Sequence, residues 1–539
     1  MRRRSPRTVH RPVPRPQRRA TTASPQAAAT PTADAPSAAT GGSWLPGVVV
    51  VVVGSFMALM NASSVNVAIS RIQGEFGGTS TQVQWISTGY TLVLGVVVPT
   101  SSWLSNRFGA RRVYVIALLV FALGSALCGI SWSLNSLILF RVVQALGGGL
   151  LPVLAQAMIY QMVPRARIGS AMGVYGLGII LGPAIGPTLG GWLVQDISWR
   201  LIFYVNLPIA VLGTVGVLAI LPPFSAGPRR RFDLPGFLFI AAGLAGLLIA
   251  SSEGSDPSFG WTSYRVLMLG AVGVLCLAVF VVIELSVEEP ILDLRVFGGW
   301  VFSLSVALSG LLNMGLFAGS YYIPLFLQQG QGLNALQAGL TLLVPGLVVT
   351  AIMPLSGRLY DLVGARWPAA VGTLLVGAAA YLMHAISPQT MREPVILASC
   401  LRNAGVGLAL IPVTTAGIAS VPAAMVGQAS AINNVVGRVA SSLGLALLGS
   451  VLIGHQWQQL NNNGSLLPAV SPGFPQLTEI AAAGQRRILG VYAAVQNQSF
   501  SRGLDDVFLL TAGICAVGVL IALLLPSGSP SRRTSAAPR

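Results

Sequence analysis

The sequence predicts an all-α protein that crosses a lipid bilayer many times. Of its 539 residues, 53% are hydrophobic and 9% are charged, whereas a soluble domain carries about 25% charged residues. Apolar runs of about 20 residues, long enough for a helix to cross the hydrocarbon core, recur along most of the chain. This composition excludes a water-soluble protein.

About fourteen apolar runs follow one another from Trp44 onward, and each predicts one spanning helix. Most connections between them are short and contain Gly, Pro or charged residues. The connection at 455–503 is long and polar, and it predicts an outside loop. The helices are expected to be centred near residues 55, 93, 121, 149, 180, 211, 243, 273, 311, 346, 377, 406, 441 and 515.

The basic residues predict how the chain is oriented. All 32 are arginines, and with 15 acidic residues they give a net charge of +17. With the N-terminus inside, most loop arginines fall on the inner side, as the positive-inside rule requires. We therefore interpret the charge as a topology signal and not as a surface for nucleic acid. It predicts a multi-pass protein of the plasma (cell inner) membrane, with a disordered basic tail at 1–44 and a second tail at 526–539, both cytoplasmic.

An internal repeat relates the first six helices to the last six. After the second helix, Asn106 is followed by Gly109 and Arg111, and after the tenth, Asp361 is followed by Gly364 and Arg366 with the same spacing. Two homologous halves are a transporter architecture. The predicted organisation is an N-terminal six-helix bundle at 45–222, two inserted helices at 233–284, and a C-terminal six-helix bundle at 299–525 that contains the loop 455–503.

Five segments carry a more specific resemblance. They are Phe56–Ala68 in the first helix, the turn at 102–112, Leu139–Gln144 in the fourth helix, Gly178–Gly191 in the fifth, and Trp199–Pro208 at the start of the sixth. In this order they resemble the motifs of the major facilitator superfamily, and within it those of the fourteen-helix drug:proton antiporters of EmrB/QacA type. The resemblance implies the major facilitator fold and alternating access between two bundles. It also implies export of small hydrophobic or amphipathic compounds, as in multidrug or antibiotic efflux.

The fifth helix is expected to form a hinge and seal. Gly182, Gly186 and Gly190 recur every four residues, a spacing that lets two helix backbones approach closely, and Pro183 removes a backbone donor and favours a bend. Helix packing without gating is the alternative. The resemblance assigns the remaining conformational switch to the two repeated turns, through Asn106, Arg107, Gly109, Arg111, Asp361 and Arg366.

Arg141 is the strongest candidate for a role in transport or coupling. A charge at the centre of a spanning helix costs about 2.5–3.5 kcal/mol on insertion scales, so it is expected to face a polar interior and a partner. Gln144 lies one turn on, on the same face. A structural arginine bound to backbone carbonyls is the alternative. The other transport candidates are Asn61, Arg402 and Asn403, and those for a substrate cavity are Trp85, Tyr90, Met314, Tyr321, Tyr322, Asn433 and Asn434.

The sequence departs from the family pattern at residues that bear on protons. Asn61 and Asn106 stand where the family usually has Asp, and an amide does not titrate. Asp and Glu are confined to tails, loops and helix ends, whereas a proton antiporter needs a group that loads and releases a proton. Proton antiport therefore competes with an uncoupled or lipid-like substrate translocator and with a non-transporting membrane sensor.

The same absence of central carboxylates bears on the cargo and on other partners. It favours neutral, amphipathic or anionic small molecules, because a buried carboxylate is the natural counter-charge for a cationic drug. The expected partners are a small-molecule substrate and the lipid bilayer, without nucleic acid or an obligate protein partner. No cofactor other than a proton gradient, no metal site and no enzymatic activity are expected, because the sequence contains no catalytic triad, phosphate loop or metal cluster.

Overall fold

The computed structural model describes residues 44–224, 231–254, 260, 262–333, 335–387, 390–464 and 478–527. Within these ranges the chain is helical apart from its connections and an isolated bridge between Gly364 and Ser527. Thirteen of the described helices are long and apolar enough to cross a membrane, or 14 if Gln82–Val97 and Thr100–Phe108 form one bent span. The predicted all-α, many-spanning fold is confirmed. The predicted tails lie outside the described residues, except for Trp44, Pro526 and Ser527.

The first bundle contains the first six predicted spans, of which the second is broken. Pro99 lacks a backbone N–H and interrupts the helix, so the two pieces meet at 56°. A capping box of Thr79 and Gln82 starts the first piece. The elements are α1 (Leu45–Phe76), α2 (Ser80–Val97), α3 (Thr100–Phe108), α4 (Ala110–Gly129), α5 (Leu134–Met162), η1 (Arg165–Arg167), α6 (Ile168–Asp196), α7 (Leu201–Tyr204) and α8 (Asn206–Ile220).

The inserted helices and the second bundle follow in the predicted order. The inserted pair is α9 (Leu234–Gly254) and α10 (Tyr264–Ser286), and η2 (Leu294–Gly298) leads into the second bundle. The second bundle consists of α11 (Trp300–Leu325), η3 (Phe326–Gly330), α12 (Ala335–Val363), α13 (Arg366–His384), α14 (Arg392–Ala419), η4 (Ala423–Met425), α15 (Val426–Gly464) and α16 (Thr478–Leu524).

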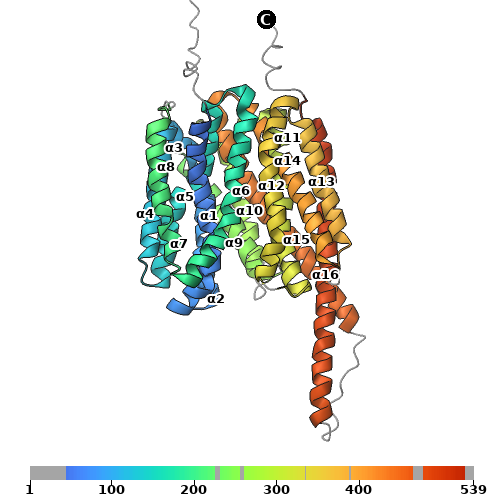
Figure 1. The fold of residues 1–539 in the computed structure, drawn as a ribbon. Coiled ribbons are helices and arrows are strands. Elements are labelled where there is room, and N and C mark those ends of the chain that lie inside the picture. The colour runs from blue at the N-terminus through green and yellow to red at the C-terminus, as the bar shows by residue number, and fades with distance from the viewer. Residues whose placement is uncertain are drawn as a thin grey trace, which may run out of the picture. The chain divides into compact units, whose positions relative to one another are not determined.

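The prediction of a loop at 455–503 is wrong for its described part. The α15 helix continues to Gly464, and α16 begins at Thr478 and runs for 47 residues. Figure 1 shows α16 reaching well beyond the ends of its neighbours. The physical reason is that 478–503 contains no Pro and many good helix formers such as Ala, Gln, Arg and Leu. A segment too polar to span a membrane is still able to form a helix.

Each bundle is held by long contacts between neighbouring helices. In the first, α1 packs along α6 and α4 along α5, and in the second, α13 packs along α14 and α16. The two bundles meet through α6 and α12 (Figure 1). The side of the helix assembly on which α1 begins and α16 ends is termed the termini side, and the opposite one the far side.

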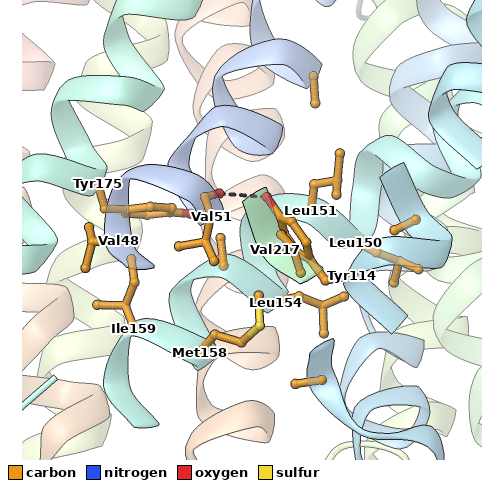
Figure 2. Close-up of a cluster of buried hydrophobic side chains, with 14 of the residues drawn as sticks. Val48, Val51, Tyr114, Leu150, Leu151, Leu154, Met158, Ile159, Tyr175 and Val217 are labelled. Atoms are coloured by element: carbon orange, nitrogen blue, oxygen red, sulfur yellow. Dashed lines mark hydrogen bonds between the residues drawn. The ribbon is translucent and has the colours of Figure 1, made fainter. Parts of the chain in front are cut away.

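Two buried tyrosine hydroxyls in the apolar core of the first bundle donate to backbone oxygens. Figure 2 shows Tyr114 from α4 among apolar side chains of α1, α5 and α8. Its hydroxyl donates to the carbonyl of Val51 at 2.7 Å, and the hydroxyl of Tyr175 donates to the carbonyl of Pro152 at 2.8 Å. These bonds satisfy buried hydroxyls and fix α1, α4, α5 and α6 relative to one another.

The inserted helices lie between the two bundles. The α9 helix packs along α10 and contacts both α2 and α15. Thr88 on α2 and Ser252 on α9 share a hydrogen bond of 3.3 Å, and the Ser251 hydroxyl donates to the carbonyl of Ser442 on α15 at 3.4 Å. The α9 helix therefore contacts both halves of the repeat.

Candidate transport site and interbundle contacts

Arg141 lies in the centre of the first bundle, where it is 1% exposed. Its Nη1 donates to Asn61 Oδ1 at 2.6 Å and to Gln144 Oε1 at 2.7 Å, and its Nε donates to the carbonyl of Ile86 at 3.3 Å. The structure thus brings together three predicted residues from α1 and α5. The partners include amides as well as a backbone carbonyl, so the group is more than an arginine bound to the backbone alone.

An aromatic ring covers the guanidinium of Arg141. The Cζ atom stands 3.8 Å from the ring centroid of Tyr90 on α2, which is a favourable cation–π arrangement when the cation is shielded from water. Gly148 on α5 leaves room for this contact, since a Cβ there would stand 2.9 Å from the Tyr90 hydroxyl. Tyr90 is 1% exposed. It therefore packs on Arg141 and lines no open cavity in this conformation.

Two further polar residues extend the Arg141 cluster, and sequence reasoning missed both. Gln144 donates from its amide nitrogen to the hydroxyl of Ser125 on α4, and Asn206 Nδ2 on α8 donates to the same hydroxyl at 3.2 Å. Both lie in otherwise apolar helices, and Asn206 belongs to the Trp199–Pro208 motif. The sequence signal that would have identified them is a polar side chain inside an apolar spanning helix.

The cluster also contains donors without acceptors. Arg141 Nη2 and Asn61 Nδ2 are buried and have no hydrogen-bond partner among the described residues. A buried donor left unpaired is unfavourable by about 1–3 kcal/mol. The present partners therefore do not satisfy all donors of the Arg141 cluster, and the cluster is able to donate to one more acceptor group.

The second bundle repeats the buried arginine with fewer partners. Arg402 on α14 is 8% exposed, and its Nη1 donates to the carbonyls of Leu316 at 3.2 Å and Gly315 at 3.5 Å on α11. Asn403 donates to the carbonyl of Pro345 on α12 at 2.9 Å. Here the alternative of an arginine bound to backbone carbonyls describes the geometry.

The residues predicted to line a substrate cavity lie in different surroundings. Tyr322 is 2% exposed and belongs to an apolar cluster of the second bundle. Asn434 on α15 donates to Gln156 Oε1 on α5 at 3.2 Å and so joins the two bundles. Trp85 and Tyr321 are exposed, and Met314 and Asn433 are half-buried. The structure therefore does not gather these residues into one site.

The two repeated turns have the same geometry. Gly109 has φ +85° and Gly364 has φ +84°, a region that favours glycine. Arg111 Nη2 donates to the carbonyl of Leu218 at 2.5 Å, and Arg366 Nε donates to that of Leu525 at 2.7 Å. Each arginine binds a carbonyl at the end of the last helix of its own bundle, where a cation is favoured.

The acidic residue of the second turn binds the opposite bundle. Asp361 accepts the N–H groups of Gly169 and Ser170, both at 2.8 Å, and the Ser170 hydroxyl at 2.6 Å. These donors belong to the first turn of α6, whose unpaired N–H groups attract an anion. Asp361 therefore caps α6 across the bundle interface, on the termini side.

The corresponding residue of the first turn makes no such cap. Asn106 is half-buried beside Gln428 on α15, and it makes none of the hydrogen bonds found between described residues. Arg107 is exposed. The segment Val163–Ser170 before and in α6 resembles Val421–Gln428 before and in α15, with Gly427 in the place of Gly169. The Asn106 side of the interface thus has a similar sequence without the anion, and it is packed less closely, because a Cβ on Gly427 would meet only Ser102 Oγ at 3.7 Å and Ser105 Oγ at 3.9 Å.

The glycines of α6 divide the helix into two parts. A Cβ on Gly173 would stand 2.9 Å from the carbonyl of Met353 on α12, so the first part packs on the second bundle. A Cβ on Gly182 would stand 3.0 Å from Met60 N on α1, and the Ser64 hydroxyl donates to the carbonyl of Gly186 at 2.8 Å. The second part therefore packs on α1. Gly190 makes the same close approach to Ser64, and α6 continues through Pro183 without a break.

Replacing Gly186 with Ala is expected to destabilise the first bundle. The added Cβ would collide with Ser63 Oγ and stand 2.8 Å from the Met60 carbonyl, which is backbone and has little freedom to move. Overpacking of this kind costs about 1–3 kcal/mol. The matched control is Gly191→Ala, whose Cβ meets only Val67 Cγ1 at 3.9 Å. Thermal unfolding in detergent should show a lower Tm for Gly186→Ala alone, and equal values for the two variants would contradict the close packing.

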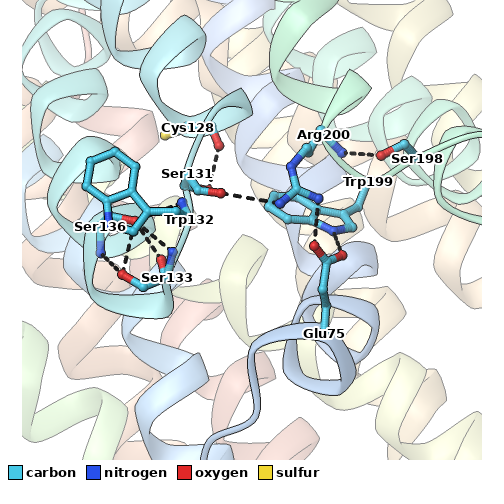
Figure 3. A network of polar contacts seen from close by, with 9 residues as sticks. All are labelled: Glu75, Cys128, Ser131, Trp132, Ser133, Ser136, Ser198, Trp199 and Arg200. Carbon is cyan, nitrogen blue, oxygen red and sulfur yellow. Dashed lines mark hydrogen bonds and ion pairs between the residues drawn. The ribbon is translucent and has the colours of Figure 1, made fainter.

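A polar network on the far side joins three parts of the first bundle. Figure 3 shows Glu75 at the end of α1 facing Trp199 and Arg200. Arg200 Nη1 forms an ion pair of 2.7 Å with Glu75, the Trp199 indole N–H donates to the same carboxylate at 2.6 Å, and Arg200 Nη2 donates to the carbonyl of Ser131 at 3.3 Å. Sequence reasoning named the Trp199–Arg200 motif but not its carboxylate partner.

A cavity of about 430 Å³ opens between the bundles on the termini side. Its walls include Tyr160 on α5, Arg165 on η1, Tyr360 on α12 and Ser420 after α14. Neither Arg141 nor Arg402 lines it. The interior arginines therefore lie away from this cavity.

Comparison with known proteins identifies the family. The profile of the Major Facilitator Superfamily matches residues 51–445. An uncharacterized MFS-type transporter of Bacillus subtilis, YhcA, is 31% identical over 88% of this chain and 92% of its own. The multidrug resistance protein B homolog of Mycobacterium tuberculosis is 30% identical over 90% of each chain. The solved structure of the proton:xylose symporter XylE superimposes with a TM-score of 0.57 at 15% identity, over 90% of this chain and 96% of that one.

These matches confirm the predicted resemblance and the predicted fold of two six-helix bundles with two inserted helices. The protein is a multi-pass membrane transporter, and its relatives include a multidrug resistance protein B homolog. The chain belongs to the Major Facilitator Superfamily.

Proposed function

We propose that this protein exports small hydrophobic or amphipathic compounds from the cell by alternating access. Both termini lie in the cytoplasm in this proposal, so the termini side faces inward and the far side outward. The loops on the termini side contain an excess of arginine, which supports this orientation. The name of the Mycobacterium tuberculosis relative supports drug-like cargo.

The single observation that carries the proposal is the asymmetric contact between the bundles. Contacts across the interface involve the first part of α6 and the Asp361 cap, on the termini side. The second part of α6 packs on α1, within its own bundle. On α12, Leu340, Leu343 and Leu347 on the far half are 53–60% exposed. Contacts between the bundles that are concentrated at one end of α6 favour alternating access, which requires two states that differ in which end of the bundles is closed.

The interior arginines define the class of cargo. Arg141 and Arg402 are buried, and their hydrogen-bond partners are amides and carbonyls, with no carboxylate among them. Arg438 lies half-buried on α15, one turn from the interbundle residue Asn434. An interior of this charge favours neutral, amphipathic or anionic compounds over cations.

Transport is driven by proton antiport in this proposal, and uncoupled transport is the alternative. Asp and Glu are absent from the helix centres, so an antiported proton would have to bind elsewhere in the protein. This absence favours uncoupled transport.

A proteoliposome experiment tests both statements. Purified full-length protein is reconstituted with an imposed pH gradient and offered a panel of labelled neutral, anionic and cationic amphiphiles. We expect neutral or anionic compounds to move and to dissipate the gradient. Movement without an effect on the gradient would overturn antiport, and movement of no compound in the panel would overturn export and favour a membrane sensor.

A further inference from the structure

Two carboxylates are buried side by side at the termini-side end of the inserted helices. Asp233 immediately precedes α9, and Glu284 lies in the last turn of α10, which packs along α9. Asp233 is 8% exposed and Glu284 is 3% exposed. A Cβ on Gly236 would collide with Asp233 Oδ2 and stand 3.1 Å from Glu284 Oε1. Glycine at this position therefore lets both carboxylates share one small space.

Each carboxylate accepts one backbone hydrogen bond and retains one oxygen without a partner. Asp233 Oδ1 accepts the N–H of Gly236 at 2.9 Å, and Glu284 Oε1 accepts the N–H of Leu292 at 3.3 Å. Asp233 Oδ2 and Glu284 Oε2 are buried and have no partner among the described residues. Unpaired anionic oxygens in such a place are strongly unfavourable, and two of them more so.

No charged group among the described residues forms an ion pair with either carboxylate. Asp293 adds negative charge beside Glu284, and Arg231 and Arg295 are exposed. The charged residues on the described elements next to the pair include Arg107, Arg231, Glu253, Arg265, Glu288, Glu289, Asp293, Arg295 and Arg438, and α10 also carries Tyr264 and Cys276.

We propose that Glu284 is a proton-binding site, in which the proton is held on the Glu284 carboxyl group beside the Asp233 carboxylate. The proton removes one of two neighbouring negative charges and gives the Glu284 carboxyl group a donor of its own. The proton comes from the aqueous phase on the termini side and returns to it. No bond other than the O–H bond forms or breaks.

The proton holds the connecting segment 287–299 in place. Leu292, whose N–H binds Glu284, is buried with Ile291 in an apolar cluster that also contains Phe302 of α11 and Ile418 of α14. When the proton leaves, the two anions must separate or gain water. Leu292 stays bound to Glu284, so a carboxylate that moves away from Asp233 displaces Leu292 within this cluster, and the protonation state of Glu284 controls how the inserted helices dock on the second bundle.

The consequence for transport rests on the proposed function. Because this proton is taken up from and returned to the same aqueous phase, it does not cross the membrane, and the site makes transport sensitive to pH on the side proposed to be cytoplasmic. Docking of the connecting segment would then transmit the proton's presence to α11, α14 and α15.

The decisive experiment measures the proton directly and needs no substrate. Infrared spectra of the full-length protein in detergent are recorded from about pH 5 to about pH 9, together with hydrogen exchange of residues 287–299. We expect a protonated-carboxyl band at neutral pH that disappears on raising the pH, while exchange of the segment increases several-fold. Glu284→Gln should lose both the band and the pH dependence of exchange. Glu288→Gln, an exposed carboxyl on the same segment, should behave as the wild type.

Asp233→Asn provides an independent test if Glu284→Gln fails to fold, and it should also lose the band. A band unchanged in both variants, or absent from the wild type at neutral pH, would overturn the site. Exchange of 287–299 that does not vary with pH in the wild type would overturn its control of docking. A protein that shows the band but moves no compound in proteoliposomes would keep the proton site and refute the proposed function, so the two failures are distinguishable.

Discussion

Replacing Arg141 with methionine is expected to reduce transport strongly while the protein still reaches the membrane. The substitution leaves Asn61 Oδ1 and Gln144 Oε1 buried without their donor, and each stranded acceptor costs about 1–3 kcal/mol. It also removes the cation that stacks on Tyr90. Since 1.4 kcal/mol changes an equilibrium tenfold, transport should fall by at least about tenfold. Initial rates in proteoliposomes at matched protein content measure the effect.

Lysine at the same position separates charge from geometry. Lysine keeps the positive charge but lacks the planar fork that donates to Asn61 and Gln144 together, and it stacks poorly on an aromatic ring. We therefore expect Arg141→Lys to be as inactive as Arg141→Met. Arg71→Met, at an exposed arginine on α1, is the control and should transport normally. Near-normal transport by the lysine variant would mean that only the charge matters.

Replacing Asp361 with Asn is expected to open the termini side. Asn has one side-chain oxygen for the three donors of Gly169 and Ser170 that the carboxylate now binds, and it lacks the charge that favours a helix N-terminus. Loss of such a cap costs about 1–2 kcal/mol, which shifts the population of the closed state about 5- to 30-fold. Distances between spin labels on the termini-side ends of α6 and α12 should lengthen.

The repeat supplies the reverse experiment. Asn106→Asp places a carboxylate beside the start of α15, where Gln428 already borders Asn106. This anion should cap α15 as Asp361 caps α6, so the single variant should favour the closed termini side. The double variant Asn106→Asp/Asp361→Asn should restore label distances close to those of the wild type. If Asn106→Asp opens the termini side instead, the two turns are not equivalent.

Sequence reasoning predicted those parts of the protein that depend on local pattern. The apolar runs predicted the spans, and the spacing of Arg141 and Gln144 predicted that they share a helix face. The two turns have the same spacing, with a glycine three residues and an arginine five residues after Asn106 or Asp361, and this spacing predicted equivalent turns. The φ angles of the two glycines agree within 1°. In each case the relevant atoms lie within a few residues of one another, so the backbone geometry of one helix or turn decides the outcome.

The remainder depends on contacts between segments that are distant in sequence. Ser125 and Asn206 join the Arg141 cluster only because α4 and α8 pack beside α5. Glu284 looked like a residue of a helix end, and its burial arises from the return of Leu292 over α10. The helical part of 455–503 was missed because hydropathy detects spans, and a polar helix has no such signal.

The hydrogen bonds of Arg111 and Arg366 have a consequence for the kinetics of the transporter. Arg111 joins the start of α4 to the end of α8, and Arg366 joins the start of α13 to the end of α16, so each bond lies within one bundle. These bonds need not break when one bundle rotates against the other. The polar contacts that must break are those across the interface, and among the described residues they include the three at Asp361 and the one between Asn434 and Gln156. These contacts contribute to the activation barrier for exchange between states, and point substitutions are able to adjust them one at a time.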